Sequence, residues 1–293
     1  MAITQLFLNG LIAGSVYALI ALGFGLIYGT TRFFHFAHGA VYTCGAYLTF
    51  LFAVWFKFPL FFSILLSIIL TSFLGILIEV GVYKPLRKRE ATSLVLLIAS
   101  LGIFIVIQNI ISLVFGDDTK TLRSGMVKEG INIFGARITP IQIAIILVSL
   151  ALFIITSIIL AKTRTGKTIR AVANDPELAI IHGIDTNRVI LYTFGIGSAL
   201  AAVAAILISF DVDMVPSMGF FALMMGVVAV IIGGVGSIPG AAFGGLLLGL
   251  AQNLGVWKIH SKWQDSIAFA ILLLFLLFKP YGFFGRKVKK VQI

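Results

Sequence analysis

The amino-acid sequence predicts an all-α, polytopic integral membrane protein. Hydrophobic residues make up 60% of its 293 residues and charged residues only 11%, and the mean hydropathy is +1.11. A soluble domain carries about 25% charged residues and roughly 45–50% apolar ones. Because so apolar a chain cannot cover its surface with polar groups, we expect lipid to be its solvent.

Apolar runs long enough to cross a bilayer recur along the whole chain, since a spanning helix needs about 20 mostly apolar residues. The second run is a weak candidate because it begins at a histidine, and the seventh because it is short and passes into GGVGSIPG, residues 233–240. We therefore expect about eight or nine transmembrane helices, one of them broken or re-entrant. The nine runs are residues 4–28, 38–56, 59–83, 93–115, 139–161, 189–210, 217–233, 238–256 and 264–279.

Basic residues predict the orientation of the chain. In a nine-span arrangement, 15 of the 22 lysine and arginine residues fall on one side of the membrane and 7 on the other. The richer side is expected to be cytoplasmic. This puts the N-terminus outside, and the C-terminus and residues 162–188 inside. The same clustering between apolar runs argues against a nucleic-acid-binding face, despite a net charge of +11.

Glycines four residues apart recur within the apolar runs, as in Gly10 and Gly14 or Gly245 and Gly249. In a bilayer, small residues at this spacing allow helix backbones to approach closely. We expect these glycines to mark tightly packed helix pairs, with a lining of the conduction path as the alternative.

The stretch RTGKT, residues 164–168, ends like a phosphate-binding P-loop, but the rest of that motif is missing. A P-loop carries an earlier glycine where this chain has Ala161, and it follows a strand. The preceding run is a predicted spanning helix. The sequence therefore predicts no ATP hydrolysis by this chain.

The next segment predicts a short cytoplasmic helix of about seven residues. Asn174 with Glu177 fits a capping box, Asp175 is the alternative cap, Pro176 suits the first turn and Gly183 supplies the stop. A helix this short is not stable alone, so it needs the rest of the chain, another protein or the membrane surface as a partner. Its apolar residues are Leu178, Ala179, Ile180 and Ile181.

Four sequence blocks resemble the permease subunits of bacterial ABC importers, specifically the shorter, LivH-like member of the branched-chain amino acid (LIV-type) family. The blocks span residues 10–39, 170–189, 231–249 and 279–285, and the first ends in HFAHG. Two residues depart from the family pattern. His35 stands where asparagine is usual, which removes any role carried over from that asparagine, and Lys279 replaces an arginine.

The resemblance implies a single permease domain over residues 1–293, with residues 162–188 as the segment that docks on an ATPase. It implies a transport subunit rather than an enzyme, in the bacterial inner membrane, with no cofactor of its own. The expected partners are a LivM-like permease or a second copy, two cytoplasmic ABC ATPases that bind ATP and magnesium, an extracytoplasmic binding protein and lipid. The implied coupling residues are Arg170, Asn174, Asp175, Pro176, Glu177, Leu178, Ala179, Ile181, His182 and Gly183.

Polar or helix-breaking residues inside spans are the candidates for a pathway or gate, because each is costly in lipid. Structural roles compete with transport for all of them: helix packing, interhelical hydrogen bonds or a plain turn. Glu79 is expected to pair with the nearby Lys84. The pathway candidates are His38, Gly39, Gln108, Asn109, Gly236, Ser237, Pro239 and Gly240.

Three other functions compete with import of branched-chain amino acids. Related permeases carry urea, short amides or simple sugars. An ion-coupled secondary transporter would require charged residues near the bilayer midplane, and the chain offers few. A membrane enzyme is disfavoured because the sequence has no cluster of histidine, cysteine or carboxylate residues, and we expect no metal site.

Overall fold

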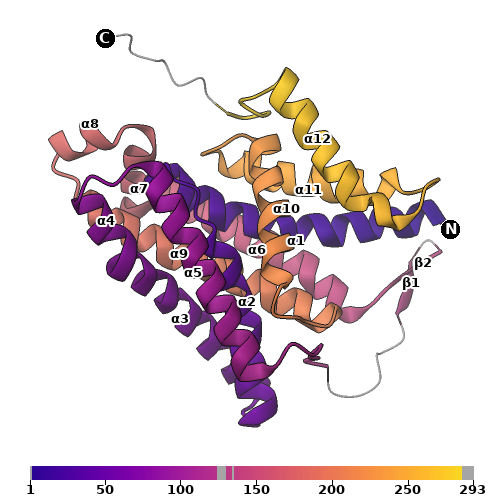
Figure 1. Ribbon diagram of the computed structural model, residues 1–293. Coiled ribbons are helices and arrows are strands. Elements are labelled where there is room, and N and C mark those ends of the chain that lie inside the picture. Colours follow the sequence, from indigo (N-terminus) through magenta and orange to yellow (C-terminus); the bar gives the residue numbers. More distant parts are fainter. Residues whose placement is uncertain (1, 124–129, 134, 286–293) are drawn as a thin grey trace.

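A computed structural model of the chain describes residues 2–123, 130–133 and 135–285 and confirms an all-α membrane fold (Figure 1). Lys128, Arg286, Lys287, Lys289 and Lys290, which the charge argument counts, lie outside the described residues. The helices are α1 (Ala2–Thr31), α2 (Ala37–Phe50), α3 (Leu60–Ile78), α4 (Lys84–Lys88), α5 (Ser93–Phe115), α6 (Pro140–Lys162), α7 (Arg164–Asn174), α8 (Pro176–Ile181), α9 (Thr186–Asp211), α10 (Met218–Gly233), α11 (Ile238–Gly255) and α12 (Gln264–Phe278).

Within the described residues, seven helices are long and apolar enough to cross a membrane, or up to eight if the bent pair α10–α11 counts as one span. The predicted break after residue 233 is confirmed, but a count of nine complete spans is too high. The second run is a full candidate span, Ala37–Trp55, which ends in a π-helical turn at Leu51–Trp55. Helix α10 has 16 residues, about 24 Å at 1.5 Å per residue, which is shorter than the hydrocarbon core of about 30 Å.

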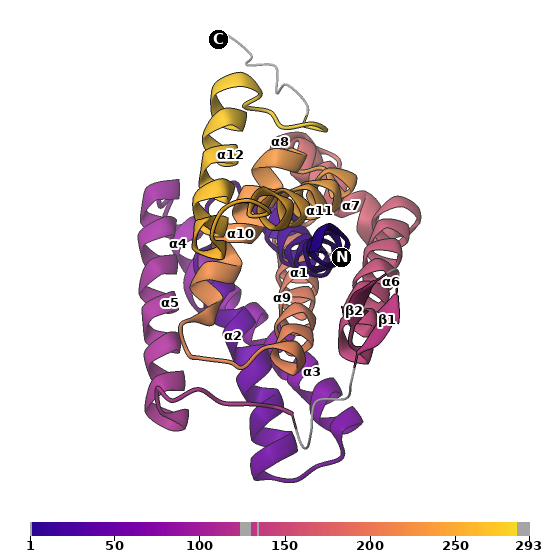
Figure 2. The ribbon, with the colours of Figure 1, turned by 90° about the vertical axis from the view of Figure 1, so that its right-hand side faces the viewer.

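Helices α1, α2 and α9 are the most buried of the candidate spans, and the other candidate spans lie further out. Of their most apolar stretches, 78% of residues are buried in α1 and 72% in α9, against 22% in α5 and 6% in α12. Figure 2 looks roughly along α1 and shows α9, α10 and α11 close around it. The peripheral helices expose leucine, isoleucine and phenylalanine, as a lipid-facing surface requires.

The most extensive helix contact joins α1 to α11 through the glycines that the sequence singled out. A Cβ atom built on Gly14 would lie 2.8 Å from Leu246 Cα, and one on Gly10 would lie 2.9 Å from Leu250 Cα. On the other helix, a Cβ on Gly249 would overlap the backbone of Gly14. The prediction of close backbone packing is confirmed here, since any side chain would force the helices apart.

Helices α10 and α11 form a hairpin with a bend of 117°. Gly234 and Gly236 adopt positive φ angles of 105° and 79° in the turn. The turn lies at the end of the bundle where α1 finishes, because a Cβ on Gly29 would lie 3.9 Å from both Gly236 and Ala173. The last described turn also returns there, since Phe283 N–H donates to Ile232 O at 2.9 Å. The α7–α8 segment and residue 285 are therefore at one end of the bundle, as the charge distribution predicts.

The opposite end carries a two-stranded hairpin, β1 (Ile131–Ile133) and β2 (Ala136–Ile138), that the sequence analysis did not predict. It is tied to the beginning of α1, because Arg137 N–H donates to Gln5 Oε1 at 2.8 Å and Gln5 Nε2 donates to Arg137 O at 3.0 Å. A backbone bridge between Lys120 and Met214 joins the same loop region to the segment after α9.

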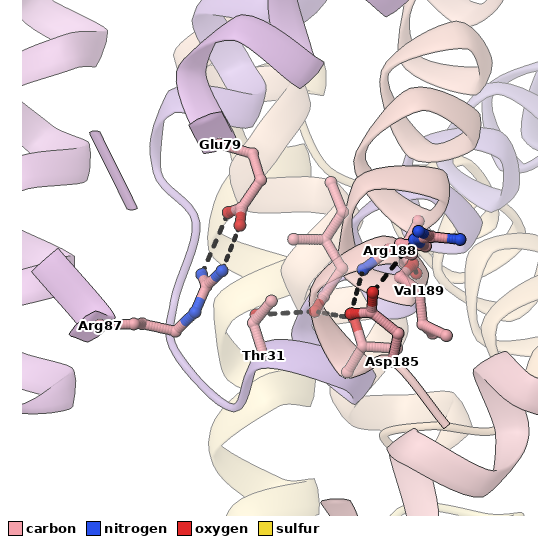
Figure 3. A network of polar contacts seen from close by, with 9 residues as sticks. Thr31, Glu79, Arg87, Asp185, Arg188 and Val189 are labelled. Atoms are coloured by element: carbon pink, nitrogen blue, oxygen red, sulfur yellow. Dashed lines mark hydrogen bonds and ion pairs between the residues drawn. The ribbon is translucent and has the colours of Figure 1, made fainter. Parts of the chain in front are cut away.

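Glu79 forms an ion pair with Arg87 rather than with Lys84, which corrects the expected partner (Figure 3). The carboxylate is 1% exposed and receives both guanidinium N–H groups, one of them at 3.0 Å. A π-helical turn at Glu79–Tyr83 adds a residue to the helix. Arg87 therefore lies two turns after Glu79 in the chain and on the same helix face. Its planar fork can bind both carboxylate oxygens, which a lysine ammonium cannot.

Candidate functional site

The segment between α6 and α9, predicted to be cytoplasmic, folds as two helices, where the sequence analysis predicted one. Thr163 caps α7 by accepting a hydrogen bond from Gly166 N–H at 3.0 Å. RTGKT therefore forms the first turn of a helix that follows another helix, with Lys167 exposed to solvent. This geometry has neither the strand nor the loop that cradles a phosphate, so the rejection of the P-loop reading is confirmed.

Helix α8 is capped by Asp175, whose side chain accepts a hydrogen bond from Leu178 N–H at 3.0 Å. The alternative cap is confirmed and the Asn174 capping box is wrong, because Asn174 is the last residue of α7. Pro176 occupies the first turn, His182 follows the last turn, and Gly183 takes the positive φ of 77° that ends the helix. Figure 1 shows α8 projecting from the bundle at the end of α7.

The surface of α8 is more apolar than solvent alone would favour. Leu178, Ile180 and Ile181 are 51%, 58% and 78% exposed, whereas Ala179 is 3% exposed and packs inward. The acidic side chains of Asp175 and Glu177 are also exposed beside them. An apolar patch with an acidic rim, on a helix of 6 residues, is a surface that a partner protein can cover.

The α7–α8 segment is joined closely to the transmembrane helices on both sides. A Cβ on Gly166 would overlap the backbone of Ile159 and Leu160, so α7 lies directly against the end of α6. On the other side, Asp185 caps α9 by accepting from Arg188 N–H at 3.2 Å and pairs with the Arg188 guanidinium at 3.1 Å (Figure 3). Arg170, also exposed, donates to Ala161 O at 3.3 Å. A displacement of α8 is thus carried to α6 and α9.

The predicted pathway residues do not gather at one place. His38 and Gly39 are fully buried at the start of α2, where His38 lies beside Gly23 of α1 and Gly39 lies against Gly219 of α10. Gln108 and Asn109 lie on the peripheral helix α5. Asn109 is exposed, and its amide donates to Ile105 O of its own helix at 2.8 Å rather than to a neighbouring helix.

Gly236 and Ser237 lie in the turn between α10 and α11, and Pro239 and Gly240 lie in the first turn of α11. Ser237 caps α11 by accepting from Gly240 N–H at 3.1 Å, and Pro239 lies in the first turn. The cavity beside the turn has a volume of ≈ 20 Å³, about the space that one water molecule occupies. Their role as a gate stays a prediction.

A cleft of ≈ 420 Å³, here called the outer cleft, lies between α1, α2, α9, α10 and α12. It is nearer the end of the bundle that the charge distribution predicts to be outside. Ligand pockets in proteins span about 300–1,000 Å³. The polar side chains that line it are Tyr17, Tyr42, Ser209, Asp213 and Asp265. The sequence analysis missed this site because its residues come from five helices. The two tyrosines and Asp265 are the available signals, since each is a polar side chain in or beside an apolar run.

The two carboxylates of the outer cleft differ in their partners. Asp213 is bound by the Arg123 guanidinium at 2.6 Å, and this hydrogen bond lowers the pKa of Asp213 below its usual range. Asp265 lies in the first turn of α12, is exposed, and has no ion-pair partner within the described part of the chain. One carboxylate is therefore neutralised and the other is free. Among residues 2–123, 130–133 and 135–285, no group of three or more histidine, cysteine or acidic side chains could hold a metal.

Known proteins match the sequence of this chain over nearly its whole length. The model of a family described as a branched-chain amino acid transport system permease component matches residues 6–276. The permease protein BraD of a high-affinity branched-chain amino acid transport system in Pseudomonas aeruginosa is 37% identical over 98% of this chain and 97% of its own length. The corresponding LivH proteins of Salmonella typhimurium and Escherichia coli are 38% and 37% identical, again over 98% of this chain and 97% of theirs.

Proposed function

Because this chain belongs to the family of branched-chain amino acid transport permease components, we propose that it carries branched-chain amino acids into the bacterial cytoplasm through the inner membrane. The chain is a multi-pass membrane permease of an ABC transporter, and not an enzyme. A permease of this class works with ATPase and binding-protein partners. Identity over nearly the full length to BraD and LivH supports branched-chain amino acids over urea, amides or sugars as the substrate.

The proposed assembly pairs this chain with a LivM-like permease or a second copy, two cytoplasmic ATPases and one extracytoplasmic binding protein. ATP and magnesium bind to the ATPases, and this chain holds no cofactor. The single observation that carries this proposal is the exposed apolar surface of α8, with Ile181 78% exposed.

Coupling follows from how α8 is connected. Leu178 and Ile181 fill a groove on an ATPase, and Asp175 and Glu177 meet basic groups at its edge. When ATP closes the ATPase pair, the groove moves α8, and the contacts of α7 with α6 and of Asp185 with α9 pass the movement into the bundle. A ligand shifts such an equilibrium only through different contacts in the two states.

At the other end of the pathway, Gly39 and Gly219 are the proposed gate. Met218 and Tyr42 line the outer cleft, and Gly39 lies one turn further toward the cytoplasm on α2. A Cβ on either glycine would overlap or crowd the other backbone. Because α2 and α10 touch backbone to backbone there, a small separation of these helices opens the floor of the cleft.

The test is co-purification and ATP-driven uptake of L-leucine in proteoliposomes that contain the permease, its ATPases and the binding protein. We expect uptake to require ATP, and Glu177→Lys with Gly183→Val to abolish ATPase binding. Asp118→Asn with Gly81→Ala is the matched control, because it changes one exposed carboxylate and one glycine with open space around it, both away from α8. Normal coupling by the Glu177/Gly183 variant would refute the coupling role, and uptake on an ion gradient without ATP would refute the importer.

A further inference from the structure

The outer cleft has a lining that is apolar on one side and acidic on the other. Its apolar residues are Ile208, Val212, Met218, Phe221, Ala222 and Met225. Met218, Phe221, Ala222 and Met225 recur at helical spacing, so one face of α10 forms an apolar wall. Such a wall suits a short aliphatic group, and a methionine side chain adapts to its shape.

The charges of the cleft favour a cation. Among the described residues that line it, none is lysine or arginine, and two are aspartate. Asp213 is already paired with Arg123 at 2.6 Å, whereas Asp265 is unpaired. Asp265 lies in the first turn of α12, where the positive end of the helix dipole interacts favourably with a carboxylate. A positively charged group entering the cleft therefore meets a free negative partner.

A tyrosine of α2 also lines this cleft. Tyr42 is only 3% exposed, and the cleft is bounded by its side chain. Within the described part of the chain its hydroxyl makes no hydrogen bond, although Ser209, on the same lining, is satisfied by Ala205 O at 2.7 Å. The Tyr42 hydroxyl is therefore available to a bound molecule, as a polar group enclosed by a ligand normally has a partner.

We propose that the outer cleft is a substrate-binding site, in which Asp265 binds the ammonium group of an aliphatic amino acid and the α10 wall holds its side chain. The Tyr42 hydroxyl supplies a further hydrogen bond. The substrate carboxylate lies toward Met218, the first residue of α10, where the positive end of that helix dipole faces the cleft. This inference rests on the proposed function as an amino-acid importer, and it adds the residues that recognise the ammonium group.

Three small molecules distinguish recognition of the ammonium group from recognition of the carboxylate group. L-Leucine carries both charges, 3-methylbutylamine lacks the carboxylate, and 4-methylpentanoate lacks the ammonium group. We expect saturation-transfer NMR on the permease in lipid nanodiscs to detect L-leucine and 3-methylbutylamine, and not 4-methylpentanoate. Equal signals from the acid and the amine would overturn the assignment of the ammonium group to Asp265.

Variants then assign the binding to the cleft. Asp265→Asn should weaken binding of L-leucine and of the amine by roughly tenfold to a hundredfold, the range for a hydrogen bond to a charged group. Ala222→Trp should block the cleft and give the same loss. Asp118→Asn, an exposed carboxylate outside the cleft, is the control and should bind like the wild type. Unchanged binding by Asp265→Asn, or an equal loss in Asp118→Asn, would overturn the proposal.

Uptake separates this inference from the function on which it rests. In the complete transporter, Asp265→Asn should reduce the L-leucine carried per ATP hydrolysed by at least about tenfold, while ATP hydrolysis continues. Normal uptake by Asp265→Asn with active wild type refutes the binding site and leaves the importer intact. Absence of ATP-driven L-leucine uptake by the wild-type complex refutes the importer itself.

Discussion

The α1–α11 contact and the surface of α8 use apolar and small residues in opposite ways. Along α1–α11, glycines at a spacing of four bring two backbones together and leave no room for a Cβ atom. On α8, leucine and isoleucine side chains project from a helix of 6 residues and are more than half exposed. The first surface is complete within the chain, whereas the second needs a partner. A substitution should therefore damage folding at one and coupling at the other.

The largest effect is expected for Gly249→Leu. A Cβ on Gly249 would overlap the backbone of both Gly10 and Gly14, so the larger side chain must separate α1 from α11. We expect a loss of more than about 5 kcal/mol, enough to prevent folding. Size-exclusion chromatography of detergent-extracted protein should find no monodisperse peak. Gly102→Leu is the control, since Gly102 has open space around it, and a folded Gly249→Leu protein would contradict the tight packing.

The second prediction concerns the exposed apolar side chains of α8. Replacing Leu178 and Ile181 by serine should leave the elution profile and Tm of the permease unchanged, because both side chains are more than half exposed. Affinity for the ATPase should fall at least about a hundredfold, since each buried aliphatic side chain contributes about 1.5–3 kcal/mol. Pull-down of the ATPase measures this loss. Lys88→Ser with Arg89→Ser, also exposed, is the control, and an equal loss there would contradict a site on α8.

A smaller effect on folding should come from the ion pair between Glu79 and Arg87. Arg87→Leu leaves a buried carboxylate without its partner, at a cost of about 3–5 kcal/mol. We expect Tm to fall by roughly 5–10 °C, measured by thermal unfolding in detergent. Lys84→Leu should change Tm little, because Lys84 makes no ion pair within the described residues. If Lys84→Leu were the more damaging variant, the pairing with Arg87 would be wrong.

The smallest effect should follow Lys167→Ala. Lys167 is exposed on α7 and lies in no phosphate-binding loop. The rate of ATP hydrolysis by the assembled transporter should therefore equal that of the wild type, measured by phosphate release. Loss of hydrolysis with intact assembly would restore a catalytic role for RTGKT.

The sequence analysis predicted most helices because long apolar runs and basic clusters are local signals. It also predicted Asp175 as the alternative cap and Gly183 as the stop of α8, since caps depend on a few neighbouring residues. It failed where the structure depends on contacts or angles between segments that a local pattern does not reveal. The break after residue 233 was predicted, but the 117° angle between α10 and α11 was not, and Lys84 was chosen as the partner of Glu79 without knowledge of a π-helical turn.

The two candidate sites, α8 and the outer cleft, differ in the same way in how far the sequence predicted them. The α8 residues are contiguous, so one segment of sequence was enough to identify them. The outer cleft combines Tyr17, Tyr42, Asp213 and Asp265 from distant parts of the chain, and only the packing of five helices brings them together. Helix α7 was missed because its 11 residues, rich in arginine and lysine, follow directly on a spanning helix.

The most direct test of the contrast between the two surfaces is the accessibility of α8 with and without its partner. Ile181→Cys, in a Cys44→Ser background, places one cysteine at the most exposed of the leucine and isoleucine positions of α8. We expect a membrane-impermeant maleimide to label it rapidly in inside-out vesicles that contain the permease alone, and slowly once the ATPases are bound. Equal labelling rates in the two samples would contradict the account of α8 as the surface that the ATPase covers.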